Sequence, residues 1–203
     1  GLVLGLCSCQ VLPQREVLCS ETDRCEGGGG TNGPKITAPF VLGQPDERSN
    51  FWPSGLNNPT AVALTSDGKL IVADRGNDRI LIWNSVPTQN QQPANLVLGQ
   101  AELSVGPRAG QPNNRRSDLP DVYRLTVDGS QLIAASEAAN FSAFYRPLPT
   151  TNNIAYSFAF DGGTGISANT FSGASPGLAA GRLYVADRAN SRVLLWSPAP
   201  TTG

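Results

Sequence analysis

Short apolar runs separated by turn-forming residues recur along most of this chain. Ala61–Leu64 ends at a Ser-Asp-Gly turn, and the runs Leu70–Ala73, Arg79–Trp83 and Leu96–Leu98 follow it. Runs of about four to eight residues that are rich in branched and aromatic side chains, and are bounded by Gly, Asp or Asn, are typical of β-strands. The pattern therefore predicts groups of four short antiparallel strands.

Part of this pattern returns almost unchanged near the end of the sequence. When Leu70 is aligned with Leu183, LIVADRGNDRILIW and LYVADRANSRVLLW share nine of fourteen positions. A match of this density indicates an internal repeat, which is the first feature to look for when a fold is inferred from sequence.

Two weaker signals extend the repeat. A degraded copy at 125–144 carries Ser136 where the other two copies carry Asp74 and Asp187, and Val-Leu-Gly-Gln at 41–44 recurs at 97–100. Four short strands per unit, repeated around an axis, is the pattern of a β-propeller blade. We therefore expect an all-β propeller with about three blades.

The shared pattern P-x-x-[VA]-A-[VL]-x-x-D-G-x-L-[YI]-V-A-D-x-x-N-x-R-[IV] resembles the NHL repeat. The resemblance is strong over 59–100 and 178–198 and weak over 120–147, and its Val-Leu-Gly-Gln variant resembles long-repeat forms of bacterial exported proteins. It implies NHL-like four-stranded blades over residues 37–203. The expected blades span about 37–93, 94–150 and 151–203.

Three blades are too few to close a ring, because propellers typically have about four to eight. The first residue is Gly1 and the chain contains no Met. We expect a partial propeller, cut from a longer six-bladed protein. The alternative is that a homodimer partner completes the ring, in which case the strand at 41–44 and both outer blade faces would be covered.

The repeated polar residues of the best copies are predicted to be structural. Asp74 and Arg79 flank the same turn, so we expect a charge-assisted hydrogen bond between them, with Asn77 satisfying turn amides. The alternative is that such residues line a ligand site at the mouth of the propeller. The corresponding residues of the last copy are Asp187, Asn190 and Arg192.

The N-terminal segment resembles a bacterial lipoprotein signal. Gly1–Leu6 is apolar and leads into Leu6-Cys7-Ser8-Cys9, which places a small residue directly before Cys9. The resemblance implies a signal remnant at 1–9 and a lipid on Cys9, and therefore an exported protein that is anchored in the bacterial cell envelope or secreted.

Residues 10–36 are expected to form a Cys-containing segment with a Gly-rich tether. If Cys7 leaves with the signal and Cys9 takes the lipid, Cys19 and Cys25 remain to form a disulfide in an oxidising compartment. Two disulfides that also use Cys7 and Cys9 are the alternative. The spacings lack the CxxC pairs typical of zinc sites, so we predict no metal there.

Composition argues against several classes of function. The chain has no His, and its 15 Lys and Arg residues against 16 Asp and Glu residues give a formal net charge of −1. Without His, the commonest general base and imidazole ligand are missing, and a nearly neutral chain has no general attraction to nucleic acid. We therefore predict no cofactor and no nucleic-acid partner, with a membrane reached only through the lipid anchor.

Binding of a protein or glycan ligand is the predicted function. Loops on rigid scaffolds commonly carry recognition, although the aromatic candidates could instead pack under a blade and the basic candidates could be ordinary solvated residues. Gly173–Gly177 spells GxSxG, but without His it is interpreted as a plain loop within the long insert 161–177. The competing function is one half of a propeller enzyme, a lyase or lactonase-like hydrolase with its metal ligands in absent blades. The candidate binding residues are Phe51, Trp52, Arg115, Arg116 and Glu137.

Overall fold

A computed structural model describes residues 40–43, 55–103, 119, 121–136, 140–161 and 174–202. The chain divides into two compact units, residues 1–41 and 42–203, and all the described strands belong to the second unit. The predicted signal remnant and Cys segment, with Cys9, Cys19 and Cys25, lie outside the described residues.

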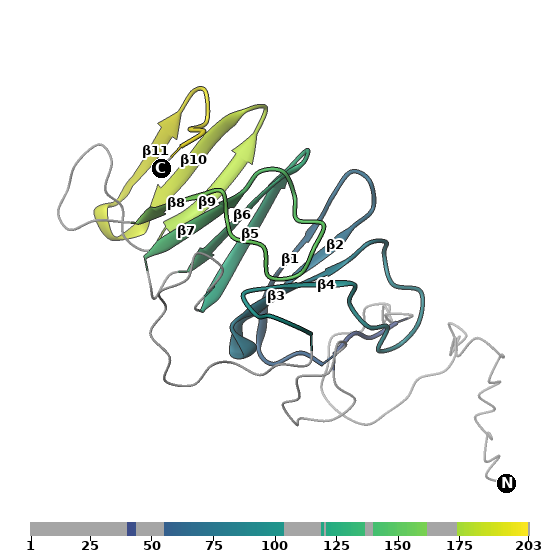
Figure 1. The fold of residues 1–203 in the computed structure, drawn as a ribbon. Helices are drawn as coiled ribbons and strands as arrows, with labels where there is room; N and C mark the ends of the chain where they lie inside the picture. The colour runs from purple at the N-terminus through teal and green to yellow at the C-terminus, as the bar shows by residue number, and fades with distance from the viewer. Residues whose placement is uncertain are drawn as a thin grey trace, which may run out of the picture. The chain divides into compact units, whose positions relative to one another are not determined.

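Three antiparallel sheets follow one another along the chain (Figure 1). The first sheet consists of β1 (Pro59–Leu64), β2 (Leu70–Asp74), β3 (Arg79–Trp83) and β4 (Leu96–Leu98). The second consists of β5 (Val122–Asp128), β6 (Gln131–Ser136), β7 (Phe141–Tyr145) and β8 (Phe158–Asp161). The third consists of β9 (Ala174–Ala179), β10 (Arg182–Asp187) and β11 (Arg192–Trp196).

The described residues are thus all-β, and their sheets have the form of partial propeller blades. Each sheet is a meander in which successive strands are neighbours, as the short apolar runs predicted. The only described helices are two single 3-10 turns, η1 (Arg75–Asn77) and η2 (Arg188–Asn190), which join β2 to β3 and β10 to β11.

Strand register makes the three sheets directly comparable. Trp83 pairs with Leu70 in the first sheet, and Trp196 pairs with Leu183 in the third. In the second sheet Tyr145 takes the place of these tryptophans. Because directly opposed residues of antiparallel strands share one face, this register assigns every residue of one sheet to its counterpart in the next.

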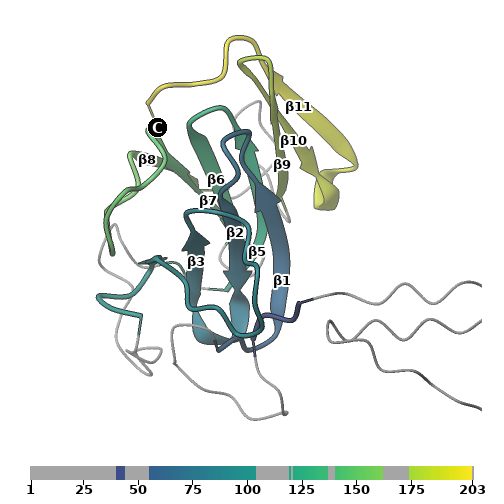
Figure 2. The ribbon, with the colours of Figure 1, turned by 90° about the vertical axis from the view of Figure 1, so that its right-hand side faces the viewer.

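Neighbouring sheets pack face to face. Contacts between sheets are concentrated on the first strand of each meander, and Figure 2 shows β1, β5 and β9 next to one another. We call the face of a sheet that is turned toward the next sheet in sequence its front face, and the opposite face its back face. The core between the first two sheets is formed by the front face of the first, including Ile71, Ala73, Ile80 and Ile82, and by the back face of the second, including Leu132, Ala134 and Tyr145.

The core between the second and third sheets is aromatic on the side of the second. The ring of Phe144 stacks on Phe158 at a centroid distance of 4.5 Å, and Phe160 stacks on Trp196 at 6.1 Å. Leu183 and Val185 complete this core from the third sheet. Burying such side chains stabilises a protein by about 1.5–3 kcal/mol each, so packing between sheets contributes substantially to stability.

The predicted divisions of the chain differ from the sheets in two places. Leu96–Leu98 pairs with β3, so the first sheet extends past the predicted boundary at 93. The interpretation of Gly173–Gly177 as a loop is wrong, because Ala174–Ala179 forms β9 and pairs with β10. Gly and Pro residues are uncommon inside strands, which is why the sequence alone suggested a loop there.

Candidate functional site

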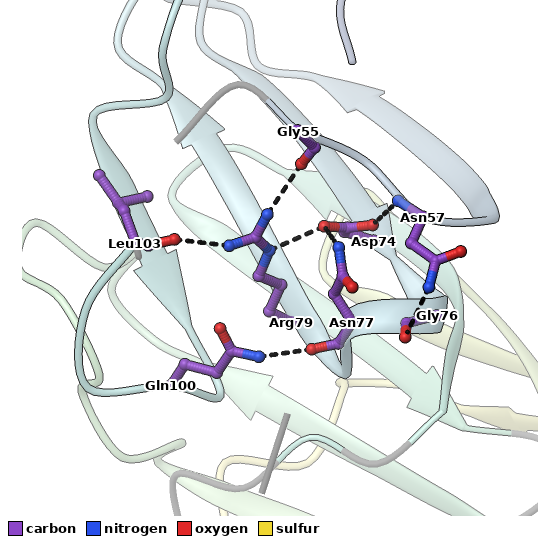
Figure 3. Close-up of polar contacts among 8 residues, drawn as sticks. All are labelled: Gly55, Asn57, Asp74, Gly76, Asn77, Arg79, Gln100 and Leu103. Carbon is purple, nitrogen blue, oxygen red and sulfur yellow. Dashed lines mark hydrogen bonds and ion pairs between the residues drawn. The ribbon is translucent and has the colours of Figure 1, made fainter. Parts of the chain in front are cut away.

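The repeated polar residues of the first sheet form one buried cluster at the turn between β2 and β3 (Figure 3). The Asp74 carboxylate accepts hydrogen bonds through Oδ2 from Arg79 Nε at 2.7 Å and from Asn77 Nδ2 at 2.9 Å. Its Oδ1 accepts one from the backbone N–H of Asn57 at 2.6 Å. The predicted contact between Asp74 and Arg79 is present, and both side chains are fully buried.

Asn77 acts differently from the prediction. Its side-chain amide donates to the Asp74 carboxylate, and its own Oδ1 accepts no hydrogen bond from the described residues, so it does not satisfy turn amides. The backbone carbonyl of Asn77 accepts a hydrogen bond from Gln100 of the Val-Leu-Gly-Gln motif. The left-handed residue of the turn is Asp78, with φ of 49°.

Position 76 in this turn has no space for a side chain, so a glycine is required there. A Cβ atom added there would lie 2.6 Å from Asn57 Cγ and 2.8 Å from the Asn57 carbonyl oxygen. The close approach allows the Gly76 N–H to donate to that carbonyl at 2.8 Å. The turn is therefore tied to the segment that leads into β1.

Arg79 links the cluster to two further parts of the chain. Its guanidinium donates to the carbonyl oxygens of Leu103 at 2.7 Å and Gly55 at 2.8 Å, besides its bond to Asp74. Figure 3 shows the guanidinium between these three partners. A planar group with several fixed donors suits this role better than an ammonium would.

The third sheet carries the same arrangement in a more open setting. Arg192 Nε donates to Asp187 Oδ2 at 2.8 Å, and Asn190 Nδ2 lies 2.9 Å from both carboxylate oxygens. The Arg192 side chain is 26% exposed, whereas its counterpart Arg79 is fully buried.

The second sheet replaces this polar cluster with aromatic packing. Ser136 and Phe141 stand where the first sheet has Asp74 and Arg79, and the Phe141 ring meets Tyr156 edge to face at 5.3 Å. The weak copy in the sequence thus has a distinct local core, while its sheet keeps the same strand order.

These clusters have the character of scaffold. The Asp74 carboxylate and the Arg79 guanidinium are buried and bonded to neighbouring groups of the same chain, which leaves no free face for a ligand. Burial, and to a lesser degree nearby Tyr156, raises the pKa of the Tyr145 hydroxyl, so this group stays protonated well into the alkaline range. Across the parts that the structure describes, no three His, Cys, Asp or Glu side chains gather as metal ligands would.

A second polar group, whose residues were not among the predicted site residues, lies where the first two sheets meet. Arg75 forms an ion pair with Asp121, and its guanidinium carbon lies 5.4 Å from the centroid of the Tyr123 ring. Arg124 lies over the same ring at 5.3 Å. Partly exposed cation–π contacts of this kind contribute about 0.5–1 kcal/mol each. In both strong copies of the repeat an Arg follows the repeated Asp, as Arg75 and Arg188, and this recurrence could have indicated the polar group from the sequence.

Residues next to the segments that were expected to bind a ligand lie at this same end of the sheets. We call this end, where β2, β6 and β10 finish at Asp74, Ser136 and Asp187, the Asp74 edge. Gly55 and Leu103 bond to Arg79 there, and Leu119 lies against Gly99, which approaches the Asp78 carbonyl. Asp161 and Ala174 pair with residues at this edge. The described residues next to the segments 104–118, 137–139 and 162–173, and Gly55 after the segment 44–54, therefore lie at this edge.

The predicted binding residues are not themselves placed. Five residues lie outside the described part of the chain: Phe51, Trp52, Arg115, Arg116 and Glu137. The described residues nearest to their segments, such as Gly55, Leu103 and Ser136, lie at the Asp74 edge. The structure therefore locates where their segments leave the scaffold.

Comparison with protein families identifies an NHL repeat at residues 56–83. This match covers β1, β2, η1 and β3, including Asp74, Asn77 and Arg79. No curated protein matches the chain. Among the described residues, no helix has the length and apolar character needed to cross a membrane.

Proposed function

We propose that this chain is a non-catalytic propeller segment of the cell envelope that binds a protein or glycan through the segments at the Asp74 edge. The observation that supports this proposal is that four segments each have at least one described neighbouring residue at the same edge of the β-sheets. Binding residues are commonly found on such connections, because the scaffold holds their ends in place.

Arg79 holds the ends of two of these segments against the sheet. One guanidinium holds Gly55 and Leu103, which directly follow and precede the segments 44–54 and 104–118. Those two segments contain the aromatic pair Phe51 and Trp52 and the basic pair at 115 and 116. Fixing the ends of a binding segment lowers the entropy lost on binding, so the buried cluster serves recognition indirectly.

The binding prediction can be tested on isolated bacterial envelopes. We expect the chain to sediment with them and a double variant, Phe51→Ala with Trp52→Ala, to bind at least about tenfold more weakly, since exposed aromatic side chains provide much of the contact energy in binding sites. Val86→Ala is the control, because Val86 is exposed and follows β3 at its opposite end. Pretreatment of the envelopes with protease or with periodate distinguishes a protein ligand from a glycan.

Equal binding by the double variant, by Arg115→Ala with Arg116→Ala, and by the control would contradict the assignment of these segments. Circular dichroism on each variant separates lost binding from lost folding.

Anchoring is a separate part of the proposal and has its own test. The Leu6-Cys7-Ser8-Cys9 box supports a lipid on Cys9. With a signal segment fused before Gly1 and expression in a bacterial host, we expect the mature chain to begin at Cys9, to carry a diacylglyceryl mass there and to fractionate with membranes. Cys9→Ser should abolish lipidation and Cys7→Ser should leave it intact. A mature N-terminus at Gln10 or later would exclude the anchor.

A further inference from the structure

A tyrosine with two arginines over its ring lies where the second sheet departs from the repeat. Tyr123 is part of an irregularity in β5, because the pairing with β6 shifts register between Val122 and Arg124. Such β-bulges are common beside functional sites, where they redirect a side chain. The guanidinium carbons of Arg75 and Arg124 lie 5.4 Å and 5.3 Å from the centroid of the Tyr123 ring. One aromatic ring therefore holds two cations.

The first sheet has small residues at the same positions. Thr60 and Ala61 correspond to Tyr123 and Arg124, because both sheets shift register at this point. The Thr60 hydroxyl donates a hydrogen bond to the Val122 carbonyl at 3.0 Å, which joins the two sheets. In the third sheet, β9 pairs with β10 here without a register shift. Among the three described sheets, the Tyr-Arg pair is thus particular to the second, and a sheet of this kind forms without it.

The two arginines differ in whether another group compensates their charge. Arg75 forms an ion pair with Asp121, whose backbone N–H donates to Asp78 Oδ1 at 2.9 Å. Arg124 is exposed, and it forms no ion pair or hydrogen bond with the residues that the structure describes. A guanidinium carries five N–H donors. Those of Arg124 are therefore available to a ligand while the Tyr123 ring holds the group in place.

A carboxylate is the anion that suits Arg124 best. The planar guanidinium matches a carboxylate through two parallel hydrogen bonds. Stacking on Tyr123 restricts the Arg124 side chain before a ligand arrives, which lowers the entropy lost on binding. A doubly charged phosphate suits the group less well, because Asp121 and Asp78 place two carboxylates among the same residues.

A protein partner fits this group better than a glycan does. A sugar that stacks on an aromatic side chain needs an open ring face, and guanidinium groups lie over the Tyr123 ring. Tyr and Arg are also enriched among the residues that contribute most to binding between proteins. The group lies at the Asp74 edge, because Arg124 pairs with Ala135, next to the last residue of β6.

We propose that Arg124, held over the Tyr123 ring, binds an Asp or Glu carboxylate of an acidic protein partner. The inference rests on the proposed function, since it takes the Asp74 edge as the binding surface and names the class of ligand. Arg124 makes the contact, and Tyr123 is a positioning residue.

Fluorescence anisotropy on the full chain tests the contact with defined probes. One probe is a labelled peptide rich in Glu and Asp, and the other is the same peptide with Gln and Asn in their place. We expect the acidic peptide to bind at least about fivefold more tightly, since charge-assisted hydrogen bonds are stronger than neutral ones. The difference should shrink as the ionic strength rises from about 0.02 M to about 0.5 M, because salt screens exposed charges.

Two arginine variants separate this contact from a general effect of charge. Arg124→Gln should weaken binding of the acidic peptide by about fivefold or more, and Arg182→Gln should change it by less than about twofold. Arg182 is a matched control, because it is exposed and begins β10, whose other end lies at the Asp74 edge. Tyr123→Leu should also weaken binding, and Tyr123→Phe should retain it, because Phe keeps the ring face beside Arg124.

Equal binding of the two peptides, or equal losses for Arg124→Gln and Arg182→Gln, would overturn the proposal. So would binding of a uronic acid oligosaccharide through Arg124 by a chain that does not bind the acidic peptide. Failure of the proposed function is a different result, because it is measured on envelopes with the variant at Phe51 and Trp52. Envelope binding that requires Phe51 and Trp52 but not Arg124 would leave that function standing without an acidic partner.

Discussion

Replacing Arg79 with alanine should lower the free energy of unfolding by about 3–5 kcal/mol, the range seen when one partner of a buried ion pair is removed. The substitution leaves the Asp74 carboxylate buried without its counter-charge and removes the donors to Gly55 and Leu103. Because small domains are stable by only about 5–15 kcal/mol, this is a large part of the total. Urea unfolding followed by tryptophan fluorescence measures it.

The third sheet contains a matched control for this experiment. Arg192→Ala removes the same contact to Asp187, but the Arg192 side chain is 26% exposed. Asp187 itself is buried, but water can enter where the partly exposed guanidinium was, so we expect a smaller loss of about 1–3 kcal/mol. Equal losses for Arg79→Ala and Arg192→Ala would show that the buried bonds to Gly55 and Leu103 contribute little.

Gly99→Ala should be the next most destabilising change, with an expected loss of about 2–4 kcal/mol from backbone strain and overpacking together. Gly99 has φ of 89°, which side chains rarely adopt, and an added Cβ would lie 2.9 Å from the Asp78 carbonyl oxygen. The clash lies in the chain that leads from the first sheet to the second. It should also disturb Leu119, whose Cβ would lie 3.2 Å from the added Cβ. Thermal and urea unfolding give the value.

Gly68→Ala isolates the backbone contribution. Gly68 has nearly the same φ, 86°, but nothing lies within 4 Å of an added Cβ. We expect a loss of about 1–2 kcal/mol, from the left-handed conformation alone. If the two variants lost equal stability, the contact with the Asp78 carbonyl would not restrict this position.

The sequence alone was sufficient to predict the central hairpins of the first and third sheets. Strand sequences that alternate with turns, and a near-duplicate of fourteen positions, predicted the hairpins β2–β3 and β10–β11, and the structure confirmed them with the same register. The Asp74–Arg79 contact was also predictable, because both residues flank a short turn and carry opposite charges. These features depend on residues close together in the chain, where local geometry decides which side chains meet.

Contacts between distant parts of the chain could be identified only from the tertiary structure. Only the fold shows that Arg79 also binds Gly55 and Leu103, each 24 positions away, and that Gly76 lies against Asn57. It also shows that Ala174–Ala179 is a strand despite its Pro and Gly, because pairing with β10 outweighs weak local propensity.

Which faces are covered was likewise decided by packing. Val62 and Leu125 are apolar residues at equivalent places in the repeat, yet one is exposed and the other packs into the core. The difference comes from whether another of the described sheets lies against them, and a pattern of apolar and polar positions does not contain that information. The sequence therefore determined the blade, and the tertiary structure determined which blades have neighbours.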